Sequence, residues 1–445
     1  MAQLSSGLAG QAKRWAVPLL LLAEVQQFTF YRNQLGDYAS PIVLYLTSVA
    51  LCFATGWVVR HEAWPPWLTG GQGPDYRRWW PAALALLLGL GLCFPVLKKA
   101  IEGTLPQDYS DIIPAITVYC QRLLAGETVH RPLTEDIGYF LEPGYLPATW
   151  FPFVIPEYLR FDYRWLSSGV LVLGLLAYVV VVVRLRRPAG VTFGLSVLPL
   201  LFAYAVLCTD GQIFTITLEP LVVGYYMLLL AAVLLPSRPL VVVALVLCLL
   251  SRFSLLFWVP LYLGLLYTQE SRRLAWGTAG LVLAGVVLLY VVPVLSHDWG
   301  LFMRVQKVYT ETALGEWKHL NGLGQPMHLY NGLGLTNLVF HNGPTDVLER
   351  LKLAKMVHLG AILTVVAGTA LYYWRQRRPR TNYRVFAVIA LKLYLATFYA
   401  LLQVPYSYLA VVGFFASFYL LVVAVGPTAQ PAIPAGRPAS SSNES

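Results

Sequence analysis

The chain of 445 residues is 57% hydrophobic and only 12% charged, with a mean hydropathy of +0.61. A soluble domain carries about a quarter charged residues, so this composition excludes an ordinary water-soluble fold and indicates a chain solvated mainly by lipid. The net charge of +10 does not imply a nucleic-acid partner, because polytopic proteins gather Lys and Arg in their cytoplasmic loops. Most of the five cysteines lie in apolar runs, with neither a disulfide framework nor a metal-ligand spacing.

Apolar runs long enough to cross a hydrocarbon core of about 30 Å recur along the chain. The first, at about 15–31, is weak, because Glu24, Gln26 and Gln27 interrupt it and should face other helices or lie near an interface. Further spans are expected at about 40–59, 80–97, 167–183, 191–208, 219–235, 275–295, 355–374, 384–402 and 407–425. These runs predict an all-α, polytopic transmembrane bundle of about 10–12 membrane segments.

One apolar stretch, Pro239 to Tyr267, is broken at Ser251-Arg252. It predicts either a hairpin of two short membrane segments or one long tilted helix. A charge at membrane depth is a functional hypothesis by default. If the stretch is a hairpin, however, Arg252 lies at its turn and is paired there with an acid.

Two long loops, 98–166 and 296–354, separate the spans, and loops of this length are usually functional. Basic clusters between the other spans mark the cytoplasmic side; they are Arg184/Arg186/Arg187, Arg272/Arg273 and Arg375/Arg377/Arg378/Arg380. If the stretch 239–267 is a hairpin, all these clusters fall on the same side of the membrane. They predict a multi-pass cell-membrane protein with both termini in the cytoplasm and both long loops outside.

The first long loop opens with two acids, Asp108 and Asp111. Apolar residues then recur at helical spacing within 110–125, at Ile112, Ile113, Ile116, Tyr119, Cys120, Leu123 and Leu124. This pattern predicts an amphipathic helix lying in the outer interface. Ser110 or Asp111 would cap it, with Pro114 in its first turn, so the spacing alone leaves Asp111 a purely structural role.

The order of motifs resembles the GT-C glycosyltransferases. The first loop reads SDIIPAITVYCQRLLAGETVHRP and then GYFLEPGYLPATWFPF, followed by DGQIFTITLEP (210–220) between later spans and VPYSYLAVV (404–412) before the last one. It is most similar to the polyprenol-phosphate mannosyltransferase type (glycosyltransferase family 87-like). The chain departs from that family at Ile213-Phe214, near which the family commonly carries Asn. It also lacks the Asp-x-Asp pair that holds a metal in the oligosaccharyl branch.

The resemblance implies three regions: an N-terminal extension with two spans (1–79), a GT-C-like catalytic domain (80–426) and a disordered tail (427–445). It implies an inverting transfer of a sugar, with mannose suggested by the family, from a polyprenyl-phosphate donor to a hydroxyl of a glycan, glycolipid or protein. Asp111 is the implied general base, and Asp108 is the alternative. No metal and no cofactor beyond the lipid-linked co-substrate are expected.

Candidates for binding the substrate, chiefly its phosphate, are Lys98, Lys99, Arg122, Arg131, Gln212, Lys307 and His319. Cations are needed where negative charge develops on the leaving phosphate. The plainer interpretation of Lys98 and Lys99 is that they reach toward lipid headgroups. Two other functions fit the same pattern of spans: a transporter or flippase for a lipid-linked or small solute, and an inactive scaffold of GT-C shape.

Overall fold

The computed structural model describes residues 2–60, 79–103, 112–134, 142–375 and 381–426, with side chains described from residue 15 onward. The regular structure in these ranges is helical, which confirms the all-α prediction. Eight of the described helices are long and apolar enough to cross a membrane; they are α2 (Ala39–Val59), α3 (Trp79–Glu102), α8 (Tyr163–Arg184), α9 (Ala189–Asp210), α14 with its continuation η5 (Arg272–Leu295), α17 (Val347–Arg375), α18 (Tyr383–Ala400) and α19 (Ser407–Val425). The chain is therefore a multi-pass helical membrane protein.

Four further helices pack within the described part of the bundle: α1 (Ala2–Thr29), α11 (Glu219–Leu234), α12 (Arg238–Leu249) and α13 (Trp258–Gln269). The last two form the hairpin. Arg238 at the start of α12 and Glu270 directly after α13 are electrostatic neighbours, so the chain returns to the end from which it entered. The short 3-10 helix η4 (Phe253–Leu255) lies in the turn between them.

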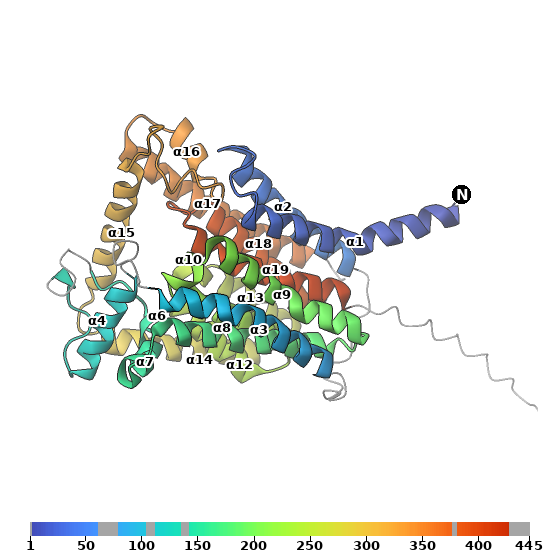
Figure 1. The fold of residues 1–445 in the computed structure, drawn as a ribbon, viewed down its shortest axis with the longest axis horizontal. Coiled ribbons are helices and arrows are strands. Elements are labelled where there is room, and N and C mark those ends of the chain that lie inside the picture. Colours follow the sequence, from blue (N-terminus) through green and yellow to red (C-terminus); the bar gives the residue numbers. More distant parts are fainter. Residues whose placement is uncertain (1, 61–78, 104–111, 135–141, 376–380, 427–445) are drawn as a thin grey trace, which may run out of the picture.

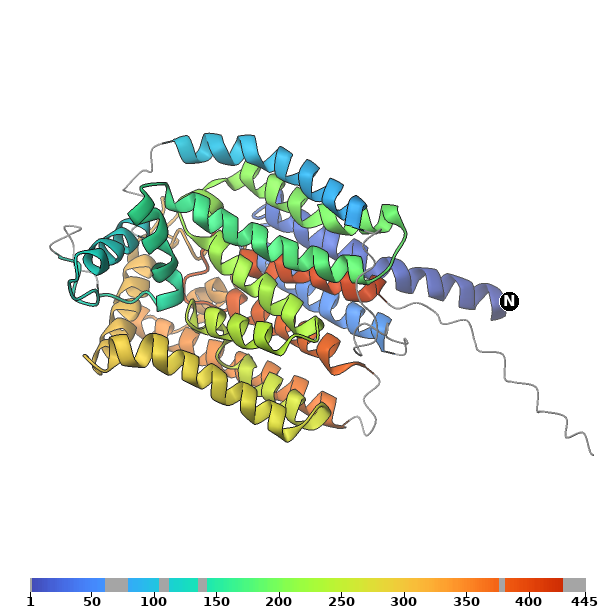
Figure 2. The same ribbon diagram turned by 90° about the horizontal axis from the view of Figure 1, so that it is seen from below.

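The elements of the two long loops lie at one end of the bundle, and the start of α1 lies at the other (Figure 1). The first loop contributes α4 (Ile112–Leu124), α6 (Pro147–Trp150), η3 (Phe151–Phe153) and α7 (Val154–Leu159); the second contributes α15 (Leu301–Lys318) and α16 (Thr336–Asn342). We call this the loop end. Figure 2 shows α3 and α14 on opposite faces of the bundle.

Close backbone approach fixes the position of α11 at the centre. A Cβ added to Gly174 of α8 would lie 2.9 Å from the Cα of Gly224 in α11. Small residues at such a crossing let two membrane helices pack backbone against backbone. The first residue of α11, Glu219, is thereby held at the loop end of the bundle.

The N-terminal helices α1 and α2 pack against each other and against α18 and α19. The Phe28 and Phe414 rings lie 4.2 Å apart, centroid to centroid, within one hydrophobic core that includes all four helices. The predicted extension 1–79 is thus joined in space to the C-terminal part of the chain.

A buried ion pair lies inside this contact. The side chains of Glu24 in α1 and Lys392 in α18 are 0% and 2% exposed, and Lys392 Nζ donates to Glu24 Oε1 at 2.6 Å. Ser417 Oγ donates to the other carboxylate oxygen at 2.6 Å, and Ser48 Oγ also donates to Glu24. The expectation that Glu24 faces other helices is confirmed, whereas Gln26 is exposed near the end of α1.

We expect Lys392→Met to destabilise the fold by about 3–5 kcal/mol, because it leaves the Glu24 carboxylate buried and unpaired. The double variant Glu24→Leu/Lys392→Met removes both charges and should recover most of that loss. Equilibrium unfolding in mixed detergent micelles measures both changes. Gln26→Ala is the control and should change the free energy of unfolding by less than about 0.5 kcal/mol. A double variant as unstable as the single one would contradict the assignment.

Candidate functional site

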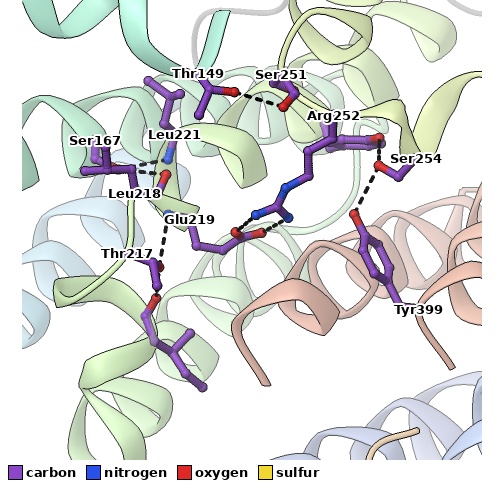
Figure 3. A network of polar contacts seen from close by, with 12 residues as sticks. Thr149, Ser167, Thr217, Leu218, Glu219, Leu221, Ser251, Arg252, Ser254 and Tyr399 are labelled. Carbon is purple, nitrogen blue, oxygen red and sulfur yellow. Dashed lines mark hydrogen bonds and ion pairs between the residues drawn. The ribbon is translucent and has the colours of Figure 1, made fainter. Parts of the chain in front are cut away.

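The first long loop is joined to the α12–α13 turn by backbone and side-chain hydrogen bonds. The Ala148 N–H donates to the Leu250 carbonyl at 3.0 Å, and Thr149 Oγ1 donates to the Ser251 carbonyl at 2.8 Å (Figure 3). The Tyr225 hydroxyl of α11 donates to the Ala148 carbonyl at 3.2 Å. The turn, the loop and α11 therefore form one connected unit at the loop end.

Arg252 occupies the turn and is paired with Glu219 (Figure 3). Arg252 Nη1 donates to Glu219 Oε1 at 2.7 Å and Nη2 to Oε2, and the Glu219 side chain is fully buried while that of Arg252 is 22% exposed. A carboxylate in the first turn of a helix is also stabilised by the helix dipole. The expectation that Arg252 lies at a turn beside an acid is confirmed, and that acid belongs to the DGQIFTITLEP segment.

Hydroxyl groups extend this polar cluster toward α18. The Tyr399 hydroxyl donates to Ser254 Oγ at 3.2 Å, and the Tyr226 hydroxyl lies 2.8 Å from the same oxygen. Each of these three hydroxyl groups has a polar partner, as buried polar groups in native proteins normally do. The cluster therefore stabilises the turn around Arg252 from both sides.

An apolar cavity of about 550 Å³ adjoins this unit. Its walls come from α12, from the first long loop and from η5 (Val287–Leu295), a π-helical continuation of α14. The apolar lining includes Leu123, Val129, Ala148, Trp150, Phe151, Val246, Leu247, Leu250, Leu288, Leu289 and Val294. This volume lies within the range of about 300–1,000 Å³ typical of ligand pockets. Since Leu288 and Leu289 are 67% and 50% exposed on a membrane helix, the cavity opens beside the lipid-facing surface.

The cavity is also lined by polar residues, which we call its rim: Glu127, Thr128, His130, His297 and Asp298. The His130 ring contacts those of Tyr119 and Trp150, with centroids 5.7 and 5.8 Å away, and its buried Nε2 has no protein hydrogen-bond partner. Burial lowers the pKa of His130 to about 4, so the imidazole is neutral at pH 7. The rim thus offers a neutral hydrogen-bonding group beside an apolar chamber.

A second rim carboxylate, Asp298, is tied to Arg304 of α15. Arg304 Nη1 and Nη2 lie 3.2 and 2.5 Å from the Asp298 oxygens, and Arg304 Nε lies 3.2 Å from Glu142 Oε1 of the first loop. Hydrogen bonds from Arg304 lower the pKa of Asp298 below its usual range. Arg304 thereby links the first and second long loops beside the cavity.

The predicted bases, Asp108 and Asp111, lie outside the described residues. The amphipathic helix predicted after them is confirmed as α4, which begins at Ile112 and buries Ile113, Ile116, Tyr119 and Cys120. Leu123, expected on the same apolar face, is 36% exposed and lines the cavity instead.

Three of the basic candidates, Lys98, Lys99 and Arg122, have different surroundings. Lys98 and Lys99 are exposed at the end of α3, with Lys98 Nζ 3.6 Å from Glu102 Oε1. Neither residue lines the cavity, and α3 lies on the face of the bundle opposite α14 (Figure 2). Arg122 is buried and donates to the carbonyls of Val129, Arg131 and Pro132 at 2.8–3.2 Å. This favours a structural role for Arg122 as the support of the loop that carries His130.

The remaining candidates are exposed and dispersed. Arg131 pairs with Glu127 at 2.9 Å, and Lys307 pairs with Glu311 at 3.8 Å. In each pair the two residues are four apart in the sequence. Gln212 begins the short helix α10 (Gln212–Thr215), and His319 directly follows α15. None of these four residues lines the cavity. Conversely, the sequence analysis did not name His130 and Asp298, which line the cavity, or Glu142, which binds Arg304 beside it. Only the position of His130 between a predicted helix and an aromatic-proline run pointed toward them.

Comparison of the chain with models of protein families, with curated proteins and with solved structures finds no match. Within the described residues, no group of three or more His, Cys, Asp and Glu side chains is close enough to hold a metal ion. The resemblance to GT-C enzymes and the metal-free chemistry it implies both stay predictions.

The buried, neutral His130 makes the stability of the first loop depend on pH. In the folded protein the pKa of His130 is about 4, below the usual value of 6.5. Between about pH 4 and pH 6.5, His130 is therefore protonated in the unfolded state and neutral in the folded state. Folding should therefore lose about 2–3 kcal/mol as the pH falls from about 6.5 to about 4. Thermal unfolding at a series of pH values measures the loss.

His130→Phe should abolish that part of the pH dependence, and the matched change at the exposed rim residue, His297→Phe, should keep it. Histidine-ring NMR provides a direct check. The resonance missing from His130→Phe should titrate near 4 in the parent protein. A midpoint near 6.5 for that resonance would contradict the burial described above.

Proposed function

We propose that the protein is an integral-membrane glycosyltransferase that moves a sugar from a polyprenyl-phosphate donor to a hydroxyl acceptor on the outer face of a cell membrane. The apolar cavity between α12, η5 and the first loop carries the proposal. A chamber with hydrocarbon walls beside lipid-facing helices suits an isoprenoid tail, because burying apolar surface drives such binding. Its polar rim suits a phosphate-linked sugar.

The side of the membrane follows from charge. Arg186, Arg273 and Arg384 lie at the end of the bundle opposite the long loops, as the helix directions require. An excess of Lys and Arg in short loops marks the cytoplasmic side. The proposal therefore places the cavity and both long loops outside and both termini in the cytoplasm.

The chemistry of the proposal is a direct displacement at the anomeric carbon. The acceptor oxygen forms a bond to that carbon as the bond to the donor phosphate breaks, and the phosphate leaves with the electron pair. Asp111 takes the acceptor proton, a role worth about 10²–10⁴ in rate. Support for Asp111 is its position directly before α4, the helix that carries Leu123 to the cavity.

Filling the cavity tests the donor site. Leu247→Trp should raise the KM for a lipid-linked donor by about tenfold or more, because a bulky side chain excludes part of the tail. Val243→Trp is the matched control: it lies one turn earlier on α12, is 50% exposed and does not line the cavity. Sugar transfer assayed over a range of donor concentrations measures both. Equal KM values for the two variants would contradict a tail in this cavity.

Asp111→Ser tests the base. Serine retains the ability to cap α4 but cannot accept the proton, so kcat should fall by about 10²-fold or more while the fold stays intact. Asp108→Ser, three residues earlier, is the control and should retain most of the activity. Near parental rates in Asp111→Ser would reduce that residue to a helix cap.

Membranes with and without the protein, incubated with radiolabelled polyprenyl-phosphate sugars, test the function itself. Mannose is the first donor to try, and transfer to glycan, glycolipid or protein identifies the acceptor class. If label crosses the membrane without being transferred, the protein is a transporter or flippase. If neither occurs with any donor, the scaffold alternative stands.

A further inference from the structure

An exposed apolar surface runs along the short helix α7 and the 3-10 turn η3 before it. Its members are large side chains with exposed fractions between 54% and 73%; they are Phe151, Ile155, Tyr158 and Leu159. Their spacing of four, three and one residues places them on one face of a helix. We call these four residues the α7 patch. An exposed apolar patch of this kind commonly marks contact with a membrane or with another protein.

The other side of α7 is attached to the first turn of α8 at the loop end (Figure 1). The Tyr163 hydroxyl donates to Glu157 Oε2 at 2.5 Å, and the Phe153 and Tyr163 rings are stacked with their centroids 5.3 Å apart. Tyr163 is the first residue of α8, which is long and apolar enough to cross a membrane. The attachment therefore places the α7 patch beside the end of a membrane span.

The lipid-facing surface of the bundle reaches nearly the same height. The Trp165 ring of α8 lies 5.8 Å, centroid to centroid, from the ring of Phe94 in α3. Phe94 is 55% exposed on a membrane helix, so it faces lipid. Because an α-helix rises about 1.5 Å per residue, Trp165 lies only about 3 Å along α8 from Tyr163. The α7 patch thus adjoins a surface that lipid covers.

The helix α4 does not supply this contact, although its apolar spacing predicted a position in the interface. Ile116, Tyr119 and Cys120 on its apolar face are fully buried, and α4 packs against η3 and α7. Cys120 Sγ donates to the Trp150 carbonyl at 3.7 Å within this packing. The apolar face of α4 is therefore covered by the protein, and the exposed apolar face of this loop segment belongs to α7.

Arg160 ends α7 in an unusual backbone conformation. Its φ of 57° and ψ of 47° lie in the left-handed region, which Gly and Asn adopt far more readily than Arg. A disfavoured conformation that is kept with a large side chain points to a function for that residue. Arg160 is exposed, and its guanidinium makes no hydrogen bond or ion pair with the described residues. This group suits a phosphate, which Arg binds through paired hydrogen bonds.

We propose that α7 is a membrane anchor of the first long loop. The α7 patch enters the leaflet at the loop end, and Arg160 binds the phosphate of a phospholipid there. Apolar and aromatic side chains beside a cation are typical of segments that lie in a membrane interface. Since Phe151 also lines the cavity, the anchor places that wall of the cavity against the leaflet. The proposal concerns lipid contact and does not depend on glycosyl transfer.

The accessibility of a nitroxide label to oxygen and to an aqueous nickel chelate tests the anchor in lipid nanodiscs. The label is placed at Tyr158→Cys in a Cys208→Ser background, since the other four cysteines are buried. We expect this label to lie about 5–10 Å inside the headgroup boundary, where oxygen reaches it and the chelate does not. Glu311→Cys on α15 is the control, because this exposed residue lies outside the α7 patch. Its label should be accessible to the chelate.

Arg160→Gly separates the phosphate contact from the fold. Glycine adopts the left-handed conformation without strain, so thermal unfolding should show an intact protein. In nanodiscs that contain phosphatidylglycerol, loss of the cation should raise the fraction of Tyr158→Cys labels exposed to the chelate about fivefold. Arg160→Lys is the matched control and should keep the parental fraction.

Three outcomes would overturn the proposal. In the first, the label at Tyr158→Cys is as accessible to the chelate as the label at Glu311→Cys, which means that water covers the patch. In the second, neither oxygen nor the chelate reaches the Tyr158→Cys label, which means that protein covers the patch. In the third, Arg160→Gly leaves the accessibility unchanged, which removes the phosphate contact.

Discussion

The pairing of Glu219 with Arg252 is the constraint on which the loop end of the molecule depends. Neither charge could remain there alone, because an unpaired buried charge costs several kcal/mol. The close crossing of α8 and α11 fixes Glu219, and Glu219 in turn fixes the position of the α12–α13 turn. With the turn held, the carbonyls of Leu250 and Ser251 point at the first loop and accept its hydrogen bonds. The first long loop is thereby held in the position where it forms one wall of the cavity.

The ion pairs Glu24–Lys392 and Glu219–Arg252 each join different parts of the bundle. Glu24 and Lys392 are almost completely enclosed and satisfied by serines on the neighbouring helices, so they join the N-terminal helices to the C-terminal ones. Arg252 is partly exposed and lies beside hydroxyl groups at the loop end. Buried pairs of this kind add specificity of helix pairing more than stability, since apolar residues of similar volume would often be equally stable.

Much of the fold follows from the sequence because lipid imposes a simple rule. Long apolar runs must be helical, and the 3.6-residue period of Ile113, Ile116 and Tyr119 was sufficient to predict α4. That Arg252 needs an acid was also predictable. Its identity was not, because Glu219 lies 33 residues earlier in the chain and is brought close only by helix packing.

The cavity was beyond sequence reasoning for the same reason. Its walls combine α12, η5 and the first loop, three segments whose spatial order no local pattern encodes. Arg122 shows the converse difficulty: a cation in a loop suggests a ligand site, yet its donors are directed at backbone carbonyls. The role of Asp111 rests on the family resemblance, because this residue lies outside those that the structure describes.

The hairpin α12–α13 has a consequence for the surrounding bilayer. Each of its helices has 12 residues and is therefore about 18 Å long, well short of a hydrocarbon core of about 30 Å. A short apolar segment is accommodated when the bilayer beside it becomes thinner. Headgroups of the leaflet on the side of the loop end would then lie closer to the turn, next to the opening of the cavity. A lipid there would need to move its polar head a shorter distance to reach the rim.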